Sequence, residues 1–401
     1  MIYVIGGGAA GFFAAISAAS QGCKVTILEK GNKVLSKVRI SGGGRCNVTN
    51  GVATLPGLLE GYPRGQKELR GPFTRFNNQD TMNWFEDRGV NLKIEKDGRV
   101  FPASDDSGSI IKCLMDEVDR LGIEIKLGFS VDGIAVSPGG FKIHSGQKCL
   151  DARKLIITTG GGSNIESYNW LHALGIQVVT PVPSLFTFNI PDSPFLDLMG
   201  VSVQDAVVSV VGTKTSTRGP VLFTHWGLSG PAVLKCSSIA ARMLQESSYS
   251  FDVQLDMLPN VTQDELRNQL KTLSQEQPSK KIETLRFEGI SSRLFEKLCD
   301  LSGIPIGLDL GNLSKQALNR LVDIVKATRL HVKGKTTFKE EFVTCGGVSL
   351  KEIEFKTMEC KKHPGIHFAG EVLDIDGITG GYNFQAAWTT GYIAGISVCA
   401  K

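Results

Sequence analysis

Residues 1–20 read MIYVIGGGAAGFFAAISAAS, and this stretch decides the fold class. The apolar run Met1–Ile5 contains Val and Ile and predicts a short buried strand. A G-x-G-x-x-G pattern follows at positions 6, 8 and 11, and the Ala-rich residues 12–20 are typical of a helix. Residues 25–28 predict a second strand that ends at Glu29. This order of strand, glycine turn, helix, strand and acid indicates a dinucleotide-binding unit.

The glycines of this turn have separate expected roles. Gly6 allows the tight turn, Gly8 lets the backbone approach a pyrophosphate, and Gly11 lets the helix pack closely on the strand. The N–H groups and partial positive charge at the start of the helix favour phosphate. Glu29 is expected to accept hydrogen bonds from an adenosine ribose. No positive charge precedes the apolar stretch, so we do not interpret it as an export signal.

Composition limits the remaining choices. A chain of 401 residues with 41% hydrophobic residues is long enough for two or three domains with real cores. Its net charge of +4 is small for this length and argues weakly against a nucleic-acid partner. The 9 cysteines contain no C-x-x-C pair and the histidines show no ligand spacing, so we expect no metal site and no disulfide framework. A cytoplasmic location is the simplest expectation, with no membrane span.

The character of the chain changes along its length and predicts three domains. Residues 1–184 and 337–401 are expected to form one discontinuous α/β domain, with helices at about 73–90 and 107–122. Residues 185–260 and 328–336 alternate β-like runs with Pro and Gly turns and predict a β-rich insert. Residues 261–327 are predicted to be helical, beginning at a capping box of Thr262 and Glu265.

A second glycine cluster lies at 39–47, which reads RISGGGRCN. Three consecutive glycines do not suit the interior of a helix or strand, so we expect close approach of this backbone to a ligand. Lys37, Arg39 or Arg45 would then neutralise phosphate charge. Asp105 and Asp106 are expected to cap the helix that begins at 107.

A third cluster decides the cofactor. Residues 370–395 read GEVLDIDGITGGYNFQAAWTTGYIAG, after a predicted strand at 366–369. Glu371 or Asp374 stands at the strand end, and residues 380–383 open an Ala-rich helix whose N-terminus would face a flavin pyrimidine ring. A protein that binds only NAD does not need this element, so the sequence predicts FAD. No second G-x-G-x-x-G follows a strand, so NAD(P)H is expected only as a transient donor.

Four segments carry a more specific resemblance: SGGGRCNVTN (41–50), FTHWGLSGP (223–231), CGGVSLKEI (345–353) and the 370–395 segment. In this order they resemble, over essentially the whole chain, a bacterial flavoprotein family. Its members are labelled NAD(P)/FAD-dependent oxidoreductase, aminoacetone oxidase or bile-acid enone reductase-like. The resemblance implies a Rossmann-like, two-part FAD-binding domain with an inserted β-barrel-like domain and a helical domain nested in that insert.

The resemblance also implies roles for individual residues. The first glycine turn would cradle the pyrophosphate, 41–47 would wrap the pyrophosphate and flavin, and the backbone of Val131 would meet the adenine. Glu371 would hold the ribitol or pyrophosphate side, and Asn383 and Phe384 would lie by the isoalloxazine. The full set of expected cofactor-binding residues is Gly6, Gly8, Ala10, Gly11, Glu29, Lys30, Lys37, Ser41, Gly42, Gly43, Gly44, Arg45, Cys46, Asn47, Val131, Thr159, Gly160, Gly161, Gly370, Glu371, Gly381, Asn383 and Phe384.

Two residues are candidates for catalysis. His225 is a proton donor or a residue that orders its loop, and Tyr382 is a proton donor or a stacking wall. Cys46 is more simply a loop residue than a covalent flavin attachment point or redox thiol. The leading hypothesis is an FAD-dependent oxidoreductase that moves hydride through flavin N5 to or from a small organic substrate, with NAD(P)H as expected donor. The alternatives are an RNA-modifying flavoenzyme, an oxygen-using amine or hydroxy-acid oxidase, and a non-enzymatic FAD-binding protein.

Overall fold

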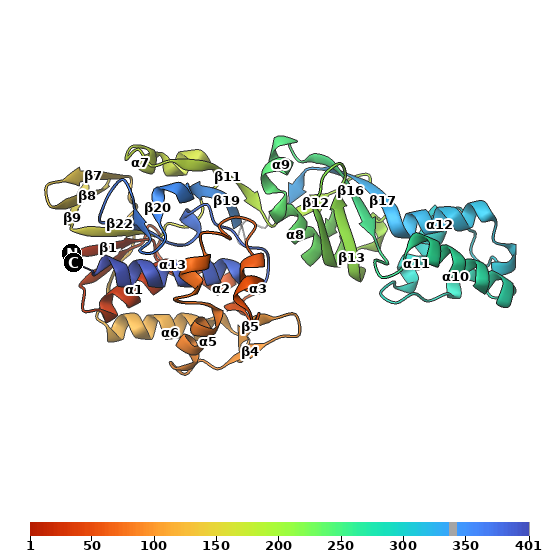
Figure 1. Ribbon diagram of the computed structural model, residues 1–401, viewed down its shortest axis with the longest axis horizontal. Coiled ribbons are helices and arrows are strands. Elements are labelled where there is room, and N and C mark those ends of the chain that lie inside the picture. The colour runs from red at the N-terminus through yellow and green to blue at the C-terminus, as the bar shows by residue number, and fades with distance from the viewer. Residues whose placement is uncertain (337–342, 401) are drawn as a thin grey trace. The chain divides into compact units, whose positions relative to one another are not determined.

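The computed structural model describes residues 1–336 and 343–400. The chain divides into two compact units, which are described separately below (Figure 1). Unit 1 contains Met1–Ser184 and Phe338–Lys401, and unit 2 contains Leu185–Thr337. Within the described part of the chain, no helix combines the length and the apolar character needed to cross a bilayer.

Unit 1 is built on a seven-stranded sheet in the order β20-β21-β22-β10-β1-β2-β6. The strands are β1 (Ile2–Ile5), β2 (Val25–Leu28), β6 (Glu124–Lys126), β10 (Lys154–Ile157), β20 (Ile353–Glu354), β21 (Glu359–Cys360) and β22 (Ile366–Phe368). The strands from β22 to β6 pair in parallel, whereas β20 and β21 extend the edge in antiparallel pairing. All four residues of β1 are buried, as expected for a central parallel strand.

Two helices from opposite ends of the chain pack against each other beside this sheet (Figure 1). They are α1 (Ala9–Ser20) and α13 (Tyr382–Val398). Gly391 and Gly395 of α13 make the close approach possible, because an added Cβ would lie 2.6 Å from the Ala10 carbonyl oxygen and 2.4 Å from that of Ala14. The N-terminal and C-terminal parts of unit 1 therefore share one core.

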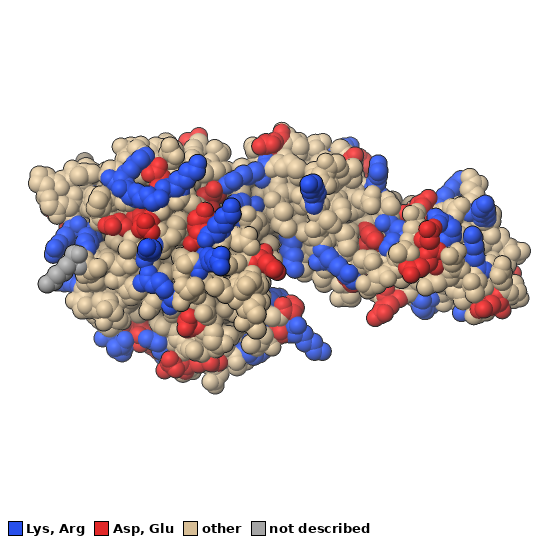
Figure 2. Space-filling model, viewed as in Figure 1, with Lys and Arg blue, Asp and Glu red and all other residues tan. Residues whose placement is uncertain are grey.

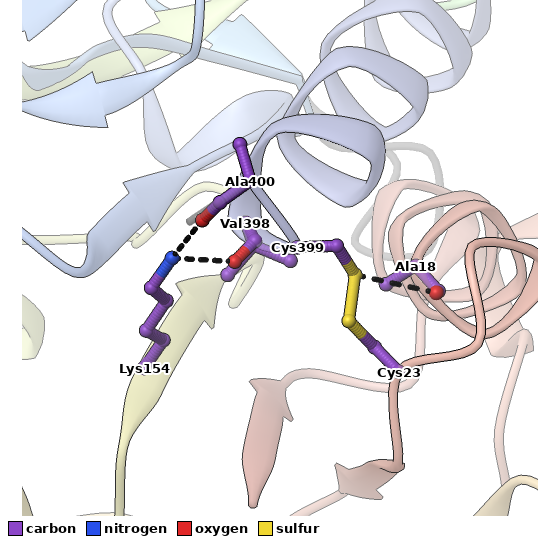
Figure 3. The surroundings of a disulfide bond; sticks show 6 residues. All are labelled: Ala18, Cys23, Lys154, Val398, Cys399 and Ala400. Atoms are coloured by element: carbon purple, nitrogen blue, oxygen red, sulfur yellow. Dashed lines mark hydrogen bonds between the residues drawn. A yellow bond between two sulfur atoms is a disulfide. The ribbon is translucent and has the colours of Figure 1, made fainter.

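A disulfide joins Cys23, just after α1, to Cys399, just after α13 (Figure 3). Lys154 lies nearby and donates to the carbonyl oxygens of Val398 at 2.8 Å and Ala400 at 2.7 Å. The spacing of the cysteines did not predict this pair, because the two residues are 376 positions apart in sequence. Only the packing of α1 on α13 brings them together.

The remaining elements of unit 1 surround the sheet. They are α2 (Ser36–Ile40), β3 (Thr49–Asn50), α3 (Leu55–Glu60), α4 (Arg70–Phe73), α5 (Asn78–Glu86), β4 (Leu92–Ile94), β5 (Arg99–Pro102), α6 (Ser107–Arg120), β7 (Gly133–Ser137), β8 (Gly140–Ser145), β9 (Lys148–Ala152), α7 (Asn169–His172), β11 (Val178–Ser184) and β19 (Val343–Val348). The single helix predicted at 73–90 is wrong, because Asn77 and Asp80 form a capping box that starts α5 separately from α4. Asp106 caps α6 as predicted, whereas Asp105 pairs with Lys93 and Arg45.

Unit 2 contains a seven-stranded antiparallel sheet in the order β17-β16-β13-β14-β15-β12-β18. Its strands are β12 (Thr187–Asn189), β13 (Ser202–Val210), β14 (Ser216–Thr224), β15 (Gly227–Ser229), β16 (Ser250–Asp256), β17 (Thr328–Lys333) and β18 (Lys335–Thr336). The strands at the two ends of this order, β17 and β18, are joined by Gly334 alone, so the sheet curves back on itself as a barrel does.

Five helices complete unit 2: α8 (Pro231–Ile239), α9 (Ala241–Glu246), α10 (Gln263–Glu276), α11 (Ser292–Leu301) and α12 (Lys315–Ala327). The predicted helical segment and its capping box are confirmed, since the Thr262 side chain accepts from the Glu265 N–H and the Glu265 carboxylate accepts from the Thr262 N–H. Leucines on α11 and α12 form part of a buried apolar core within this unit.

Candidate cofactor site

The turn between β1 and α1 is closely packed at two glycines and open at a third. An added Cβ would lie 2.4 Å from the Thr158 carbonyl oxygen at Gly6, and 1.9 Å from the Gly6 carbonyl oxygen at Gly11. At Gly8 it would meet nothing within 4 Å. Gly8 is the N-cap of α1, and no side chain caps this helix. The open side of the turn therefore presents the start of α1 to a ligand.

Thr158 binds this turn from the neighbouring strand, and the sequence analysis did not identify it. It follows β10, and its hydroxyl donates to the carbonyl oxygens of Ile5 and Gly6, both at 3.0 Å. These bonds hold the end of β1 against the end of β10. Its place at the end of a buried strand, just before a glycine run, was the available signal.

Glu29 lies at the end of β2 with its carboxylate fixed by backbone donors. Oε2 accepts from the Gly7 N–H at 2.8 Å and Oε1 accepts from the Gly31 N–H at 2.7 Å. Each carboxylate oxygen can accept a second hydrogen bond, so the group remains able to bind ribose hydroxyls.

A cavity of about 260 Å³ opens beside Glu29. Five more predicted cofactor residues line it, together with aromatic residues that include Tyr168. The five are Lys30, Val131 and Thr159–Gly161. The Tyr168 hydroxyl accepts from the Gly162 N–H at 2.9 Å, and burial raises the pKa of Tyr168 to about 12. Tyr168 is therefore a neutral polar group in a wall that also contains the acidic Glu29 and the basic Lys30.

The second glycine cluster offers its backbone rather than its side chains. Gly42, Gly43 and Gly44 have φ values of 59°, 69° and 86°, in the left-handed region that favours glycine. An added Cβ at Gly43 or Gly44 would meet nothing within 4 Å. Ser41 turns inward instead, since its hydroxyl donates to the Val38 carbonyl oxygen at 2.9 Å.

Cys46 also points away from any ligand. Its side chain is fully buried, and this burial raises the pKa of the thiol to about 12. A protonated, buried thiol is a poor nucleophile and a poor redox group. The geometry therefore agrees with a packing residue, not with a flavin attachment point.

Two of the three predicted phosphate-binding cations, Arg45 and Lys37, have acidic partners in the protein. Arg45 pairs with Glu95 at 2.7 Å and with Asp105 at 3.4 Å, and the hydrogen bond to Glu95 is the main cause of its raised pKa. Lys37 pairs with Glu371 at 2.7 Å. The second pair joins the second glycine cluster to the third across 334 residues of sequence.

Glu371 is held from a second side as well. Its Oε1 accepts from the Thr344 N–H at 2.9 Å. Gly370, just before it, packs on α1 rather than on a ligand, because an added Cβ would lie 2.7 Å from the Ala10 Cβ. Gly370 and Ala10 thus form a close contact with each other, and their predicted roles toward the cofactor stay predictions.

The third cluster ends at the N-terminus of α13. Gly381 is the N-cap, with a φ of 92°, and no side chain caps the helix. The Asn47 side chain reaches this point, because its amide oxygen accepts from the Gly381 N–H at 3.0 Å and its nitrogen donates to the Thr49 carbonyl oxygen at 3.0 Å. The second and third clusters therefore meet directly.

Asn383 and Phe384, predicted to lie by the isoalloxazine, make contacts within the protein. The Asn383 side chain accepts from the Gly377 N–H at 2.8 Å and donates to the Gly377 carbonyl oxygen at 3.0 Å. Phe384 stacks on Trp388, with ring centroids 5.5 Å apart. Asn383 therefore fixes the loop before α13.

Tyr382 is half-buried at the start of α13. Its ring lies over Gly61 and edge-on to Tyr62, whose hydroxyl donates to the Tyr382 carbonyl oxygen at 2.7 Å. Among the described residues its hydroxyl has no hydrogen-bond partner. Burial, with a smaller contribution from Glu60, raises the pKa of Tyr382, so this hydroxyl stays protonated at neutral pH.

His225 belongs to unit 2 and lies in the exposed turn between β14 and β15. Its ring packs edge-on against Trp226, with centroids 4.3 Å apart. Its role toward the cofactor stays a prediction. Across the described residues, no group of three His, Cys, Asp or Glu side chains is arranged to hold a metal ion.

The residues of unit 1 fit an FAD. The start of α1 is open at Gly8, where a Cβ would fill the cradle. The cavity beside Glu29 offers space for the adenosine half of the cofactor. The open backbone at 43–44 and the uncapped start of α13 continue the site beyond the first nucleotide unit. A dinucleotide with a long second half needs both parts.

Comparison with known proteins extends over the whole chain. The HI0933-like protein Rossmann domain family matches residues 1–397. The chain is 31% identical to the ribosomal RNA dihydrouridine synthase of Haemophilus influenzae, over 98% of this chain and 97% of that protein. It is 29% identical to the 3-dehydro-bile acid delta(4,6)-reductase of Clostridium scindens, over 98% of both chains.

A solved structure has a similar fold. The 3-ketosteroid-delta4-(5alpha)-dehydrogenase of Rhodococcus jostii matches with a TM-score of 0.53 and 15% identity, over 100% of this chain and 96% of that one. The chain therefore belongs to the HI0933-like Rossmann-domain family of FAD-binding oxidoreductases.

Proposed function

We propose that this protein is an FAD-dependent reductase that saturates a carbon–carbon double bond conjugated to a carbonyl group, with NAD(P)H as donor. The observation that carries the proposal is the full-length similarity to two differently named enzymes whose reactions share this step. A dihydrouridine is a uridine whose ring double bond, conjugated to a carbonyl, has been saturated. A delta(4,6)-reductase of a 3-oxo steroid acid saturates double bonds conjugated to its ketone.

The residues of unit 1 supply binding and orientation for this chemistry. When bound, FAD supplies hydride transfer at its N5. Gly8 and the start of α1 hold the pyrophosphate, and Glu29 holds the ribose. The uncapped N-terminus of α13 places partial positive charge at the other end of the site, where it favours negative charge on a reduced cofactor.

Saturation of a conjugated double bond also needs a proton at the carbon next to the carbonyl. Tyr382 meets this need, because it lies at the start of α13 and its hydroxyl is protonated. No described side chain forms a hydrogen bond with this hydroxyl. His225 is the second candidate donor, and substitution separates the two. A Tyr382→Phe enzyme that loses turnover but still accepts electrons from NAD(P)H identifies Tyr382 as the donor.

The test begins with the FAD-loaded protein under anaerobic conditions. NADH and NADPH are added separately, and flavin absorbance is followed. Rapid bleaching supports the nicotinamide donor, and a steroid enone that restores the colour and gains two hydrogens in mass supports the reductase. Bleaching by an amine or a hydroxy acid, with none by either nicotinamide, overturns the proposal in favour of an oxidase.

A uridine of ribosomal RNA is the second candidate substrate, and it requires the same chemistry. The name of the Haemophilus influenzae relative favours it. A surface feature also favours it, because exposed lysines flank the β20–β21 hairpin at 351, 356, 361 and 362. Figure 2 shows basic side chains gathered over this part of unit 1, with acidic ones beside them. Such a surface suits a phosphate backbone.

The two substrates are distinguished by one comparison. Unmodified ribosomal RNA and a steroid enone are offered to the reduced enzyme, and both products are analysed by mass spectrometry. Dihydrouridine at one position, with binding that weakens steeply as salt rises, selects RNA. Saturated steroid with no RNA product selects the small molecule. If NAD(P)H reduces the enzyme but neither product forms, both proposed substrates are wrong and NAD(P)H is still supported as the donor.

A further inference from the structure

The loop that leads into α13, residues 374–381, is clamped by a buried ion pair. Asp376 has no exposed side-chain surface, and both its carboxylate oxygens accept from the Arg64 guanidinium. The Arg64 side chain is itself 12% exposed. A bidentate pair of this kind fixes both distance and orientation, because the guanidinium fork matches the carboxylate in only one plane.

The pair belongs to a longer contact between two chain segments. Residues 61–65 run beside 375–382, with a backbone bridge between Arg64 and Asp376 and a hydrogen bond of 2.8 Å from the Ile378 N–H to the Gly61 carbonyl oxygen. An added Cβ at Gly65 would lie 2.7 Å from Ile375. The loop therefore contacts residues 61–65 at Ile375, Asp376 and Ile378.

A third segment reaches the same carboxylate. The Ser184 hydroxyl donates to Asp376 Oδ2 at 2.9 Å. Ser184 is the last residue of β11 and of the first of the two segments that form unit 1. The buried Asp376 carboxylate thus binds residues from two other parts of the chain, so the loop has little freedom to shift around it.

Between Asp376 and α13 the loop is also held by side-chain hydrogen bonds. Asn383 holds Gly377 from the helix side, and Asn50 donates to the Gly380 carbonyl oxygen at 3.1 Å. These bonds set the local shape of the loop, but both depend on where the loop begins. The Arg64–Asp376 pair supplies that starting point.

We propose that the Arg64–Asp376 pair, with Ser184, is a positioning device that fixes residues 374–381 and so directs the N-terminus of α13 toward the flavin. These residues act through the loop and do not themselves touch the reacting atoms. The proposal rests on FAD binding by unit 1 and not on the identity of the substrate. Its test can therefore fail while the proposed reaction stands, and the reverse also holds.

The experiment compares Asp376→Asn with the double variant R64M/D376L. Burial of an unpaired Arg64 destabilises Asp376→Asn, whereas the double variant replaces both charges with apolar groups and regains stability. Apoprotein melting temperature, FAD affinity by fluorescence quenching, and the affinity of the loaded protein for sulfite are measured. Sulfite reports the charge environment of protein-bound flavin, because its binding places negative charge on the pyrimidine side.

Both variants are expected to bind FAD about tenfold more weakly and sulfite about two- to fivefold more weakly, the size of a lost helix-terminus interaction. Ser184→Ala keeps the ion pair but removes one hydrogen bond to Asp376, so it should weaken both affinities in the same direction and by less than the charge variants do. Asp205→Asn, which breaks the exposed Arg218–Asp205 pair of unit 2, is the matched control and changes neither. A double variant with parental FAD and sulfite affinities overturns the proposal, because the pair is then only structural.

Discussion

Replacing Gly8 with alanine separates ligand approach from fold stability. Gly8 has a φ of −94°, which any residue adopts, and an added Cβ meets nothing within 4 Å. Alanine is a poorer N-cap than glycine by about 1 kcal/mol or less, and it gains about 0.4–1 kcal/mol by restricting the unfolded chain. The two effects offset each other, so the free energy of unfolding of the apoprotein should lie within about 1 kcal/mol of that of the parent.

The same methyl group lies on the side of the turn where the pyrophosphate must approach. Forcing an extra carbon into a close contact costs about 1–3 kcal/mol, which weakens FAD binding about 5- to 150-fold. Gly11→Ala is the contrasting variant, because its Cβ would lie 1.9 Å from the Gly6 carbonyl oxygen and must disturb the fold itself.

The assay titrates apoprotein with FAD by fluorescence quenching and measures urea unfolding without FAD. Gly71→Ala in α4 is the control, since its Cβ also meets nothing within 4 Å and it lies outside the glycine turn. It should leave FAD affinity unchanged. A Gly8→Ala protein with parental FAD affinity would refute the assignment of this turn to the pyrophosphate, and an unfolded one would refute the claim that the fold tolerates a Cβ at this position.

Three further predictions follow from other parts of the structure. Cys399→Ser should lower the free energy of unfolding by up to about 5 kcal/mol, the scale for closing a very long loop. A thiol reductant should lower the melting temperature of the parent to about that of Cys399→Ser. A parent whose melting temperature does not change with reductant contradicts a stabilising disulfide. Burial lowers the pKa of His367 from 6.5 to about 4. The unfolded state then binds the extra proton, so stability should fall by up to about 3 kcal/mol as pH drops from about 6.5 to about 4. Urea unfolding of His367→Gln should lack this component, and an equal pH slope in the variant excludes His367 as its source. Tyr382→Phe should reduce turnover about 100-fold or more while FAD affinity holds, measured by steady-state kinetics and titration. Unchanged turnover removes Tyr382 as proton donor.

Local patterns predicted the elements whose determinants lie close together in sequence. The glycine turn at 6–11, the acid at Glu29 and the capping box at 262–265 each depend on residues within one or two turns of chain. The predicted helix at 73–90 failed for the same local reason, since the capping box at 77–80 was not recognised as a helix start. Reading that box would have separated α4 from α5.

Residue roles that depend on distant partners could not be predicted in this way. Arg45 was predicted to neutralise phosphate charge and Asn383 to lie by the isoalloxazine, and both roles stay predictions; their contacts with Glu95 and Gly377 were not predicted. The Arg64–Asp376 pair spans 312 residues. One signal was available and missed, because glycines four apart, as at 391 and 395, are typical of close helix packing.

The order of synthesis gives the packing of α1 on α13 a consequence for biogenesis. The ribosome makes α1 before unit 2 and α13 after it, whereas unit 2 is continuous in sequence. Unit 2 can therefore fold while translation continues, but the apolar surface of α1 stays uncovered until α13 has been made. FAD loading therefore depends on the synthesis of α13, and a chain truncated before α13 exposes an aggregation-prone surface.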